Sequence, residues 1–249
     1  MERTLTQFMS TLLVTLFVLT ASLVEADEET KPSNTEPPQS NYYIYRASPY
    51  NSKGGSQAAI SRAQYVVNFG TREGVVPGST FRVFRGEIYL GMVRVEQTWR
   101  DSATVSLVDL EVKIDRQDPL PFARGDRLFP KYVMLETVNF GTGTPLFSKD
   151  MHERLRYTAR FILSFPDFPV MLAGHTDNSG KKEKNVELGK SRGEEIRKFL
   201  NEVHLVPLQQ MHSVGYADDQ PLANNSTPEG RKRNRRVEIV LVDELPASR

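Results

Sequence analysis

The pattern of hydrophobic and polar positions divides the chain into a leader, a polar stretch and two folded regions. Residues 8–24 are continuously apolar or hydroxylic, and residues 27–41 contain three prolines, four acidic residues and no large apolar side chain. From Tyr42 to about Lys131, apolar and polar positions alternate in short segments, which is typical of β-strands. From Tyr132 onward, helical spacing appears between shorter apolar runs. The pattern therefore predicts two domains, at residues 42–131 and 132–243, and a tail at residues 244–249.

The leader has the features of a signal peptide. A weakly positive start, Met1-Glu2-Arg3, precedes the apolar run, and Val24-Glu25-Ala26 offers compact residues before a cleavage point. We expect residues 1–26 to be a signal peptide that is cleaved after Ala26. The alternative is an uncleaved anchor helix, since 17 residues lie at the short edge of what spans a membrane. Both interpretations predict export, and no later run is long enough for another membrane-spanning helix. The polar residues 27–41 predict a disordered linker.

The first domain is predicted to be a small all-β unit. Its strand-like segments are Gln64–Phe69, Thr80–Arg85, Tyr89–Glu96, Ala103–Leu107 and Leu128–Phe129, with Gly91 in a bend. The turns Val75–Gly78 and Arg124–Arg127 separate them. The segments GVVPGSTFRVFR, YLGMVRV and ARGDRLF resemble the small SH3-like β-barrels of bacterial envelope proteins. A transmembrane barrel is not expected, because eight strands alone would need about 80 residues with lipid-facing bands.

The second domain alternates strands and helices. The predicted elements are a strand at Tyr132–Phe140, a helix at Ser148–Ser164, a strand beginning at Val170, a helix at about Lys184–Val203, and strands at Met211–Gly215 and Val237–Val242. This order predicts helices packed on one face of a mixed sheet. The second helix is expected to bury a stripe that contains Asn185, Leu188, Arg192, Ile196, Phe199, Leu200 and Val203.

Composition narrows the possible functions. The formal net charge of the 249 residues is +1, and the chain has no cysteine. Disulfides, thiolate metal sites and cysteine nucleophiles are therefore excluded. Five of the six residues from Arg231 to Arg236 are basic. This run alone would suggest nucleic-acid binding, but export and the nearly neutral total charge argue that no nucleic acid is bound.

The stretch AGHTDNSG, residues 173–180, is the strongest candidate for a site. A buried strand that ends in His175-Thr176-Asp177 could hold a metal, catalyse a proton transfer or bind a ligand. Arg192 lies on the otherwise buried stripe of the following helix, where a guanidinium is costly unless its charge is paired. Asn185 lies two turns earlier on the same face. In the final strand, alternation places Arg235 on the face of Val237, Ile239 and Leu241 and points Arg236 away.

Catalysis and metal binding find less support in the sequence. His175 and Asp177 could share a metal, but His152, His204 and His212 have no metal-ligand spacing to them. No serine lies in a nucleophile elbow, and no second carboxylate is paired for hydrolysis. We therefore expect no catalytic residue, no metal and no cofactor. A carboxylate and guanidiniums around one cleft instead suggest a clamp for a zwitterion, because Asp177 can accept from an ammonium while arginine donates to a carboxylate.

Three motifs together resemble a known family. GHTDNSG, NVELGKSR and STPEGRKRNRRVEI resemble the OmpA-like C-terminal domain, a peptidoglycan-binding module, over about residues 132–242. The resemblance implies a C-terminal βαβαββ domain with helices packed on a mixed sheet, which follows the SH3-like barrel predicted separately for the N-terminal part. It further implies that Asp177 and Arg192 grip the diaminopimelate residue of the stem peptide. The family's helix asparagine and the first arginine of its Asn-Arg-Arg motif fall on Asn185 and Arg235.

The chain departs from the family pattern at several positions. Gly141 stands where the family often has an aspartate, Gly189 stands where the family has a helix serine, and the small residue after the helix arginine is Gly193. Two glycines are expected to weaken that helix by about 1–2 kcal/mol. The resemblance implies a protein of the periplasm or cell envelope, in association with the outer membrane or free of it. The role of the first domain is left open by the sequence, and a protein partner in the envelope is one role it could have. The alternative is an inner-membrane-anchored subunit of an envelope complex that braces on the wall.

Overall fold

The computed structural model describes residues 40–48, 63–111 and 120–246, which belong to one compact unit. The predicted signal peptide, residues 1–26, lies outside the described residues, as does the predicted linker except for Ser40 and Asn41. Ser40 is buried and its hydroxyl donates to the Leu128 carbonyl over 2.7 Å, so this end of the predicted linker is packed. No helix within the described ranges is long and apolar enough to cross a membrane.

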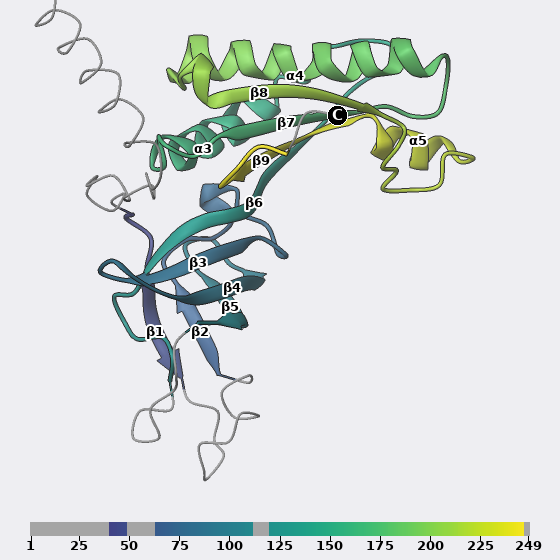
Figure 1. Cartoon of the computed structure of the whole chain (residues 1–249). Helices are drawn as coiled ribbons and strands as arrows, with labels where there is room; N and C mark the ends of the chain where they lie inside the picture. Colours follow the sequence, from purple (N-terminus) through teal and green to yellow (C-terminus); the bar gives the residue numbers. More distant parts are fainter. Residues whose placement is uncertain (1–39, 49–62, 112–119, 247–249) are drawn as a thin grey trace, which may run out of the picture. The chain divides into compact units, whose positions relative to one another are not determined.

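One sheet of nine strands runs through the described part of the chain, in the order β1-β2-β5-β4-β3-β6-β9-β7-β8. The strands are β1 (Ile44–Ser48), β2 (Gln64–Val67), β3 (Thr80–Arg85), β4 (Ile88–Thr98), β5 (Ala103–Leu110), β6 (Arg127–Asn139), β7 (Val170–His175), β8 (Met211–Ala217) and β9 (Arg236–Val242). Neighbouring strands are antiparallel except for β7 and β8, which are parallel. The predicted mixed sheet is therefore present (Figure 1).

Strands β1 to β5 and the first half of β6 form the β-rich part that the alternating pattern predicted. An isolated bridge between Tyr43 and Arg127 and a hydrogen bond from the Ile44 amide to the Asp126 carbonyl (3.0 Å) join β1 to the start of β6. Gly91 has a φ of 149°, and a Cβ there would lie 2.3 Å from the Asp109 carbonyl oxygen, so the predicted bend needs glycine. The assignment of this part to SH3-like barrels stays a prediction.

Strand β6 connects the two parts of the sheet. Its first half pairs with β3 and its second half with β9, so the predicted boundary between residues 131 and 132 falls inside a continuous strand. Aromatic side chains link the parts further. The ring of Tyr42 lies 4.8 Å from that of Phe161 in α3 (Met151–Leu163), and Phe161 also contacts Phe69 and Phe81 edge-on. The division into two domains remains a prediction.

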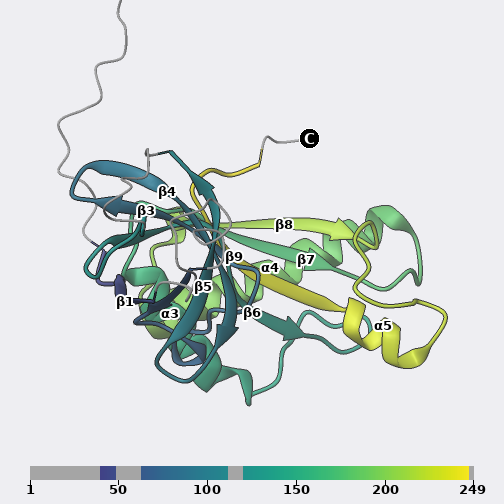
Figure 2. The ribbon, with the colours of Figure 1, turned by 90° about the horizontal axis from the view of Figure 1, so that it is seen from below.

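The helices α3 and α4 (Lys182–His204) pack against the sheet, and α4 runs along β7 and β8 (Figures 1 and 2). The predicted buried stripe of α4 is confirmed at Asn185, Arg192, Ile196 and Leu200. It is wrong at Val203, which is 56% exposed near the end of the helix. The predicted order also missed α5 (Pro228–Asn234), a short helix that the Thr227 hydroxyl caps by accepting from the Gly230 amide over 3.0 Å.

Gly189 of α4 has a structural role besides its predicted cost to the helix. A Cβ on Gly189 would lie 2.5 Å from the Gly174 carbonyl oxygen, and a Cβ on Gly174 would lie 1.9 Å from the Gly189 carbonyl oxygen. Helix and strand backbones therefore touch at this point, where no side chain fits between them. Gly189 costs helix propensity but permits the contact that places α4 directly beside the end of β7.

Candidate functional site

Asp177 lies in the loop that follows β7, at the carboxyl end of a strand whose residues are all buried. The Thr176 amide donates to the Ala217 carbonyl over 2.8 Å and continues the pairing with β8 beyond the strand. The Asp177 Oδ1 accepts from the Ser179 amide at 3.1 Å, and its Oδ2 accepts from Arg235 Nη1 at 2.9 Å. Burial acts to raise the pKa of Asp177, but the bonds from Arg235 and Ser179 outweigh it and hold that pKa below its usual value.

Antiparallel pairing explains why Arg235 meets Asp177. Strand β9 runs opposite to both β6 and β7, so the start of β9 lies beside the ends of those two strands. Arg235 immediately precedes β9, and its main-chain carbonyl accepts from the Phe140 amide at 2.9 Å. Its Nε donates to the Phe140 carbonyl at 3.3 Å. The side chain is 14% exposed and that of Asp177 is 8% exposed, so the ion pair lies just below the surface.

Arg192 is fully buried and does not form an ion pair with Asp177. Its guanidinium donates to three main-chain carbonyls, those of Gly141 (2.8 Å), Thr144 (3.1 Å) and His175 (3.0 Å). The same group lies 5.1 Å from the ring centre of Phe140. Burial, and secondly the charge of Arg235, lower the pKa of Arg192 to about 10, so it stays protonated at neutral pH. Arg192 thus ties the loop at residues 141–144 to the end of β7.

Asn185 completes the framework of the loop. Its Nδ2 donates to the main-chain carbonyls of Asp177 (3.3 Å) and Ser179 (3.1 Å) from the first turn of α4. Asn185 therefore contacts the backbone that carries the Asp177 carboxylate, and does not contact the carboxylate itself. The structure places Asp177, Asn185, Arg192 and Arg235 around one loop, with the side-chain ion pair between Asp177 and Arg235.

His175 ends β7 close to this site, and its side chain is buried. The side chain is 1% exposed, its ring stacks on Tyr216 at 5.4 Å, and its Nε2 lies 4.0 Å from Glu238 Oε2. Neither ring nitrogen has a hydrogen-bond partner within the residues described. Burial, and then the charge of Arg236, lower the pKa of His175 to about 4, against the effect of Glu238. Within the described ranges, no three His, Asp or Glu side chains are grouped to hold a metal.

Sequence reasoning missed the main-chain partners of this site. The carbonyls of Phe140, Gly141 and Thr144 accept from Arg192 and Arg235, although nothing in these residue types signals a binding role.

Arg236 was expected to point away from the cleft and does so: it is 2% exposed and pairs with Glu238. Chemically, the arrangement presents a carboxylate and a guanidinium next to each other, where β7 ends and β9 begins.

The comparison with protein families matches this part of the chain. The sequence model of the OmpA family matches residues 139–235. The peptidoglycan-binding protein ArfA of Mycobacterium tuberculosis is 32% identical over 152 residues, which are 58% of this chain and 44% of ArfA. The outer-membrane lipoprotein YfiB of Pseudomonas aeruginosa is 32% identical over 111 residues, which are 45% of this chain and 66% of YfiB.

The solved structure of the peptidoglycan-associated lipoprotein from Burkholderia pseudomallei is similar over 42% of this chain and 88% of that one, with 27% identity and a TM-score of 0.40. The chain spans less than half the length of the ArfA relatives that it matches. The family match covers the end of β6, the loop with Asp177, α4 and Arg235. Residues 139–235 of this chain are therefore a domain of the OmpA family.

Proposed function

We propose that the OmpA family domain binds peptidoglycan without a covalent bond and thereby holds this protein at the cell wall. The observation that carries the proposal is the ion pair of Asp177 with Arg235 (2.9 Å) at the end of β7, in a domain of this family. The name of the ArfA relatives, which describes them as peptidoglycan-binding, supports the same function. A non-enzymatic role follows, because binding alone explains the site.

The proposed ligand is the diaminopimelate residue of the stem peptide. Its side chain ends in a carbon that carries both an ammonium and a carboxylate, so the group is zwitterionic. The ammonium would donate to Asp177 and the carboxylate would accept from Arg235, so that each charge of the internal pair receives a new partner of opposite sign. Because the pair and the ligand are both neutral overall, no net charge is buried when the ligand inserts.

Arg192 is proposed to contribute in two ways. Three of its five N–H groups already bind main-chain carbonyls, which fixes the loop at residues 141–144 and leaves two donors for a ligand carboxylate. The side chain is 0% exposed, so direct contact requires that this loop move on binding. Asn185 is proposed to hold the Asp177 loop in the binding conformation through its two bonds to the backbone.

The affinity of a single site is expected to be modest. A hydrogen bond to a charged group contributes about 1.5–3 kcal/mol net, but here the ligand replaces an existing ion pair, so only part of that gain remains. Peptidoglycan presents many identical stem peptides on one polymer. If several copies of the protein are held together, their sites bind that polymer with avidity, which would retain them at the wall.

The β-rich part, residues 42–131, is proposed to be an SH3-like barrel that contacts a protein partner in the envelope. The protein as a whole is then exported to the periplasm and attached to the wall, at the outer membrane or free of it. N-terminal sequencing of the purified protein distinguishes cleavage after Ala26 from a retained inner-membrane anchor. A start at Asp27 supports the cleaved form, and a start at Met1 supports the subunit that stays anchored in the inner membrane.

Co-sedimentation with purified sacculi tests the proposal. The protein from Asp27 onward is expected to pellet with diaminopimelate-type sacculi, and the Asp177→Ala, Arg192→Ala and Arg235→Ala variants are expected to stay in solution. Arg233→Ala is the matched control, since Arg233 is exposed in the same basic run. Thermal unfolding shows whether each variant is folded.

Lysine-type sacculi test the specificity, because lysine lacks the second carboxylate. Equal pelleting with both wall types would contradict the assignment of diaminopimelate while leaving wall binding intact. Equal pelleting of the parent protein and of folded Asp177→Ala and Arg235→Ala would contradict the proposed site.

A further inference from the structure

The nine-stranded sheet ends at β8, and the outer edge of β8 pairs with no strand among the residues that the structure describes (Figure 2). The opposite end of the sheet is closed by hydrogen bonds within the chain. The Ile44 amide of β1 donates to the Asp126 carbonyl at 3.0 Å, and the Ile44 carbonyl accepts from the Gly125 amide at 2.8 Å. Of the two ends of the sheet, β8 therefore offers the open edge.

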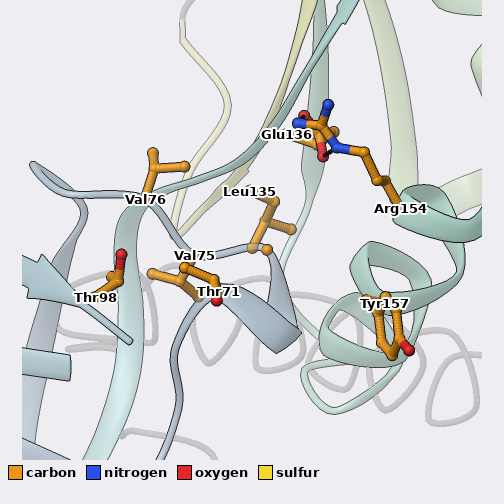
Figure 3. A pocket seen from close by; sticks show the side chains of 9 residues that line it. Thr71, Val75, Val76, Thr98, Leu135, Glu136, Arg154 and Tyr157 are labelled. Carbon is orange, nitrogen blue, oxygen red and sulfur yellow. Dashed lines mark hydrogen bonds and ion pairs between the residues drawn. The ribbon is translucent and has the colours of Figure 1, made fainter. Parts of the chain in front are cut away.

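The cavity of about 300 Å³ between β6 and α3 shows the contrasting case, in which polar groups bond within the chain (Figure 3). Glu136 Oε2 accepts from Arg154 Nε at 2.8 Å, and Glu136 Oε1 accepts from the Thr137 amide at 2.7 Å. Val75 and Leu135 of the cavity wall are each 1% exposed. These groups satisfy one another, whereas the outer main-chain groups of β8 face no strand.

The sequence of β8 does not protect this edge. Edge strands of natural proteins usually carry charges, prolines or bulges that prevent pairing with another chain. Strand β8 has the sequence MHSVGYA, which contains no Lys, Arg, Asp, Glu or Pro, and its pairing with β7 is regular from Met211 to Gly215. All residues of β7 are buried, but the five residues from His212 to Tyr216 are half-buried. The edge is thus accessible to a strand of another molecule.

Two copies of β8 complement each other when they pair antiparallel about an axis at Val214. His212 would lie opposite Tyr216 of the second copy, and Ser213 opposite Gly215 of the second copy. Val214 and Tyr216 pack on the face of the sheet that lacks helices, so apolar and aromatic pairs would form there and stabilise the strands. Ser213 and Gly215 lie against α4, so only small side chains would meet on that face.

The position of α4 leaves room for the second copy. A Cβ on Gly215 of β8 would lie 2.0 Å from the Val186 carbonyl oxygen, and a Cβ on Gly174 of β7 would lie 1.9 Å from the Gly189 carbonyl oxygen. The helix axis therefore runs above the space between β7 and β8. Because neighbouring strands are about 4.8 Å apart, the two α4 helices would lie about 10 Å apart. Packed helices are usually separated by about 8–10 Å.

Opposite charges would meet between the two helices in this register. Lys190 lies at the level of Gly215, because a Cβ on Gly215 would be 3.1 Å from the Lys190 amide nitrogen. Glu194 follows Gly193, where a Cβ would lie 3.0 Å from the Ser213 Cβ. Since Gly215 lies opposite Ser213 of the second copy, Lys190 would meet Glu194 of the second copy, and the two-fold axis forms this contact twice.

The same charges disfavour a shifted register. With the axis at Ser213, Lys190 would face the region of Arg197 of the second copy, and two like charges would meet. Arg197 lies near the start of β8, since its Nη2 donates to the Leu208 carbonyl at 2.9 Å. Glu194 already bonds Arg197 within the helix at 3.2 Å, but its side chain is 45% exposed and can accept from a second cation.

We propose that two copies of this protein form a two-fold dimer through β8 and α4, centred on Val214. The sheet would continue from one copy into the other. The two Asp177 loops would lie about 30 Å apart at opposite ends of the paired strands. The dimer itself is independent of the proposed function, and only its consequence rests on it: two wall sites in one particle would bind one polymer with avidity.

Sedimentation equilibrium of the purified protein tests the dimer. The protein from Asp27 onward is expected to show a reversible monomer–dimer equilibrium with a dissociation constant on the order of 10 µM, because one strand pair and one helix contact form a small interface. Val214→Lys would place two like charges opposite each other at the axis and should weaken the dimer at least about tenfold. Val108→Lys is the matched control, since Val108 is a 39% exposed valine of β5.

Exchanging charges tests the helix contact. Lys190→Glu and Glu194→Lys should each weaken the dimer, because like charges would then face each other. An equal mixture of the two variants should dimerise again, since each variant brings the sign that the other lacks. Mixing would not repair a damaged fold, so this result reports the contact itself. Thermal unfolding verifies that every variant folds.

Disulfide formation tests the register. The chain has no cysteine, so a single introduced thiol can bond only to another copy. Val214→Cys should oxidise in air to a linked dimer. His212→Cys is the matched control and should stay unlinked, because the two copies of residue 212 would be about 13 Å apart along the strands, too far for a disulfide.

Four outcomes overturn the inference. A monomer at every concentration, or equal dimerisation of folded Val214→Lys, would mean that another molecule or another part of this chain covers β8. A mixture of the charge variants that stays monomeric, or equal linking of His212→Cys and Val214→Cys, would exclude this interface.

Two variants separate this inference from the proposed function. Asp177→Ala should lose pelleting with sacculi and keep the dimer. Val214→Lys should pellet more weakly but keep binding to a free diaminopimelate peptide.

Discussion

Replacing Arg192 by lysine tests whether its buried guanidinium holds the site together. The guanidinium makes three bonds, to Gly141 (2.8 Å), His175 (3.0 Å) and Thr144 (3.1 Å), and its side chain is fully buried. A lysine ammonium keeps the charge, but it is a single point and lacks the fork that reaches carbonyls in different directions. We expect it to keep one of the three bonds.

The expected loss follows from the bonds that disappear. Two hydrogen bonds to a charged group, at about 1.5–3 kcal/mol each, give a loss of about 3–6 kcal/mol, and water entering beside the loop reduces this to about 3–4 kcal/mol. For a protein of this size the midpoint of thermal unfolding should fall by about 10 °C. Urea unfolding followed by circular dichroism measures the change in the free energy of unfolding.

Arg100→Lys is the matched control, because the Arg100 side chain is 83% exposed and its replacement should change the free energy by less than about 0.5 kcal/mol. A loss below about 1 kcal/mol for Arg192→Lys would refute the reasoning, since it would mean that the three bonds contribute almost nothing beyond what lysine or water replaces.

Three further predictions follow from other contacts. Burial lowers the pKa of His175 from 6.5 in the unfolded chain to about 4 in the fold, so the unfolded state binds the proton first as the pH drops. The free energy of unfolding should therefore fall by up to about 3 kcal/mol between pH 6.5 and 4. Urea unfolding should show a flatter dependence of this free energy on pH for His175→Gln. Gly189→Ala should lower the free energy of unfolding by about 2 kcal/mol or more, although helix propensity alone predicts a gain of about 1 kcal/mol; a more stable variant would contradict the close contact with Gly174. Binding to sacculi should stay constant from about pH 7 to 5, because Arg235 and Ser179 hold the pKa of Asp177 below its ordinary value in spite of burial. A decline of pelleting that begins near pH 6 would show that another titratable group controls the binding.

Much of the fold could be read from local patterns. The alternating segments of the β-rich part, the amphipathic stripe of α4 and the buried run of β7 depend on period and composition, and these elements form near the predicted positions. Helix α5 was missed because its residues, PEGRKRN, carry no apolar stripe. The Thr227 cap and the proline in the first turn are the features that indicate this helix. The basic residues from Arg231 to Arg236, which overlap α5, were interpreted only as a charged segment.

The sequence predicted which residues lie near the candidate site, but it did not predict which of them form hydrogen bonds with each other. Helical periodicity placed Arg192 on the buried face, and alternation placed Arg235 toward the cleft. Neither shows which arginine meets Asp177, because the side-chain pairing depends on strands that are far apart in sequence. In the fold, β9 runs antiparallel to β7 and begins beside the end of β7. Arg235 therefore forms the ion pair with the Asp177 carboxylate, and Arg192 donates to main-chain carbonyls such as that of Gly141.

The sequence by itself determined the local character of each segment, the buried position of Arg192 and the family of residues 139–235, because these depend on residue types at short spacing. The tertiary structure alone decided three other features: the continuity of β6 between the two parts, the backbone contact of Gly174 with Gly189, and the cavity beside Glu136 and Arg154. Each of them joins residues that are distant in sequence, and such contacts are set by strand order and helix packing, which no local pattern encodes.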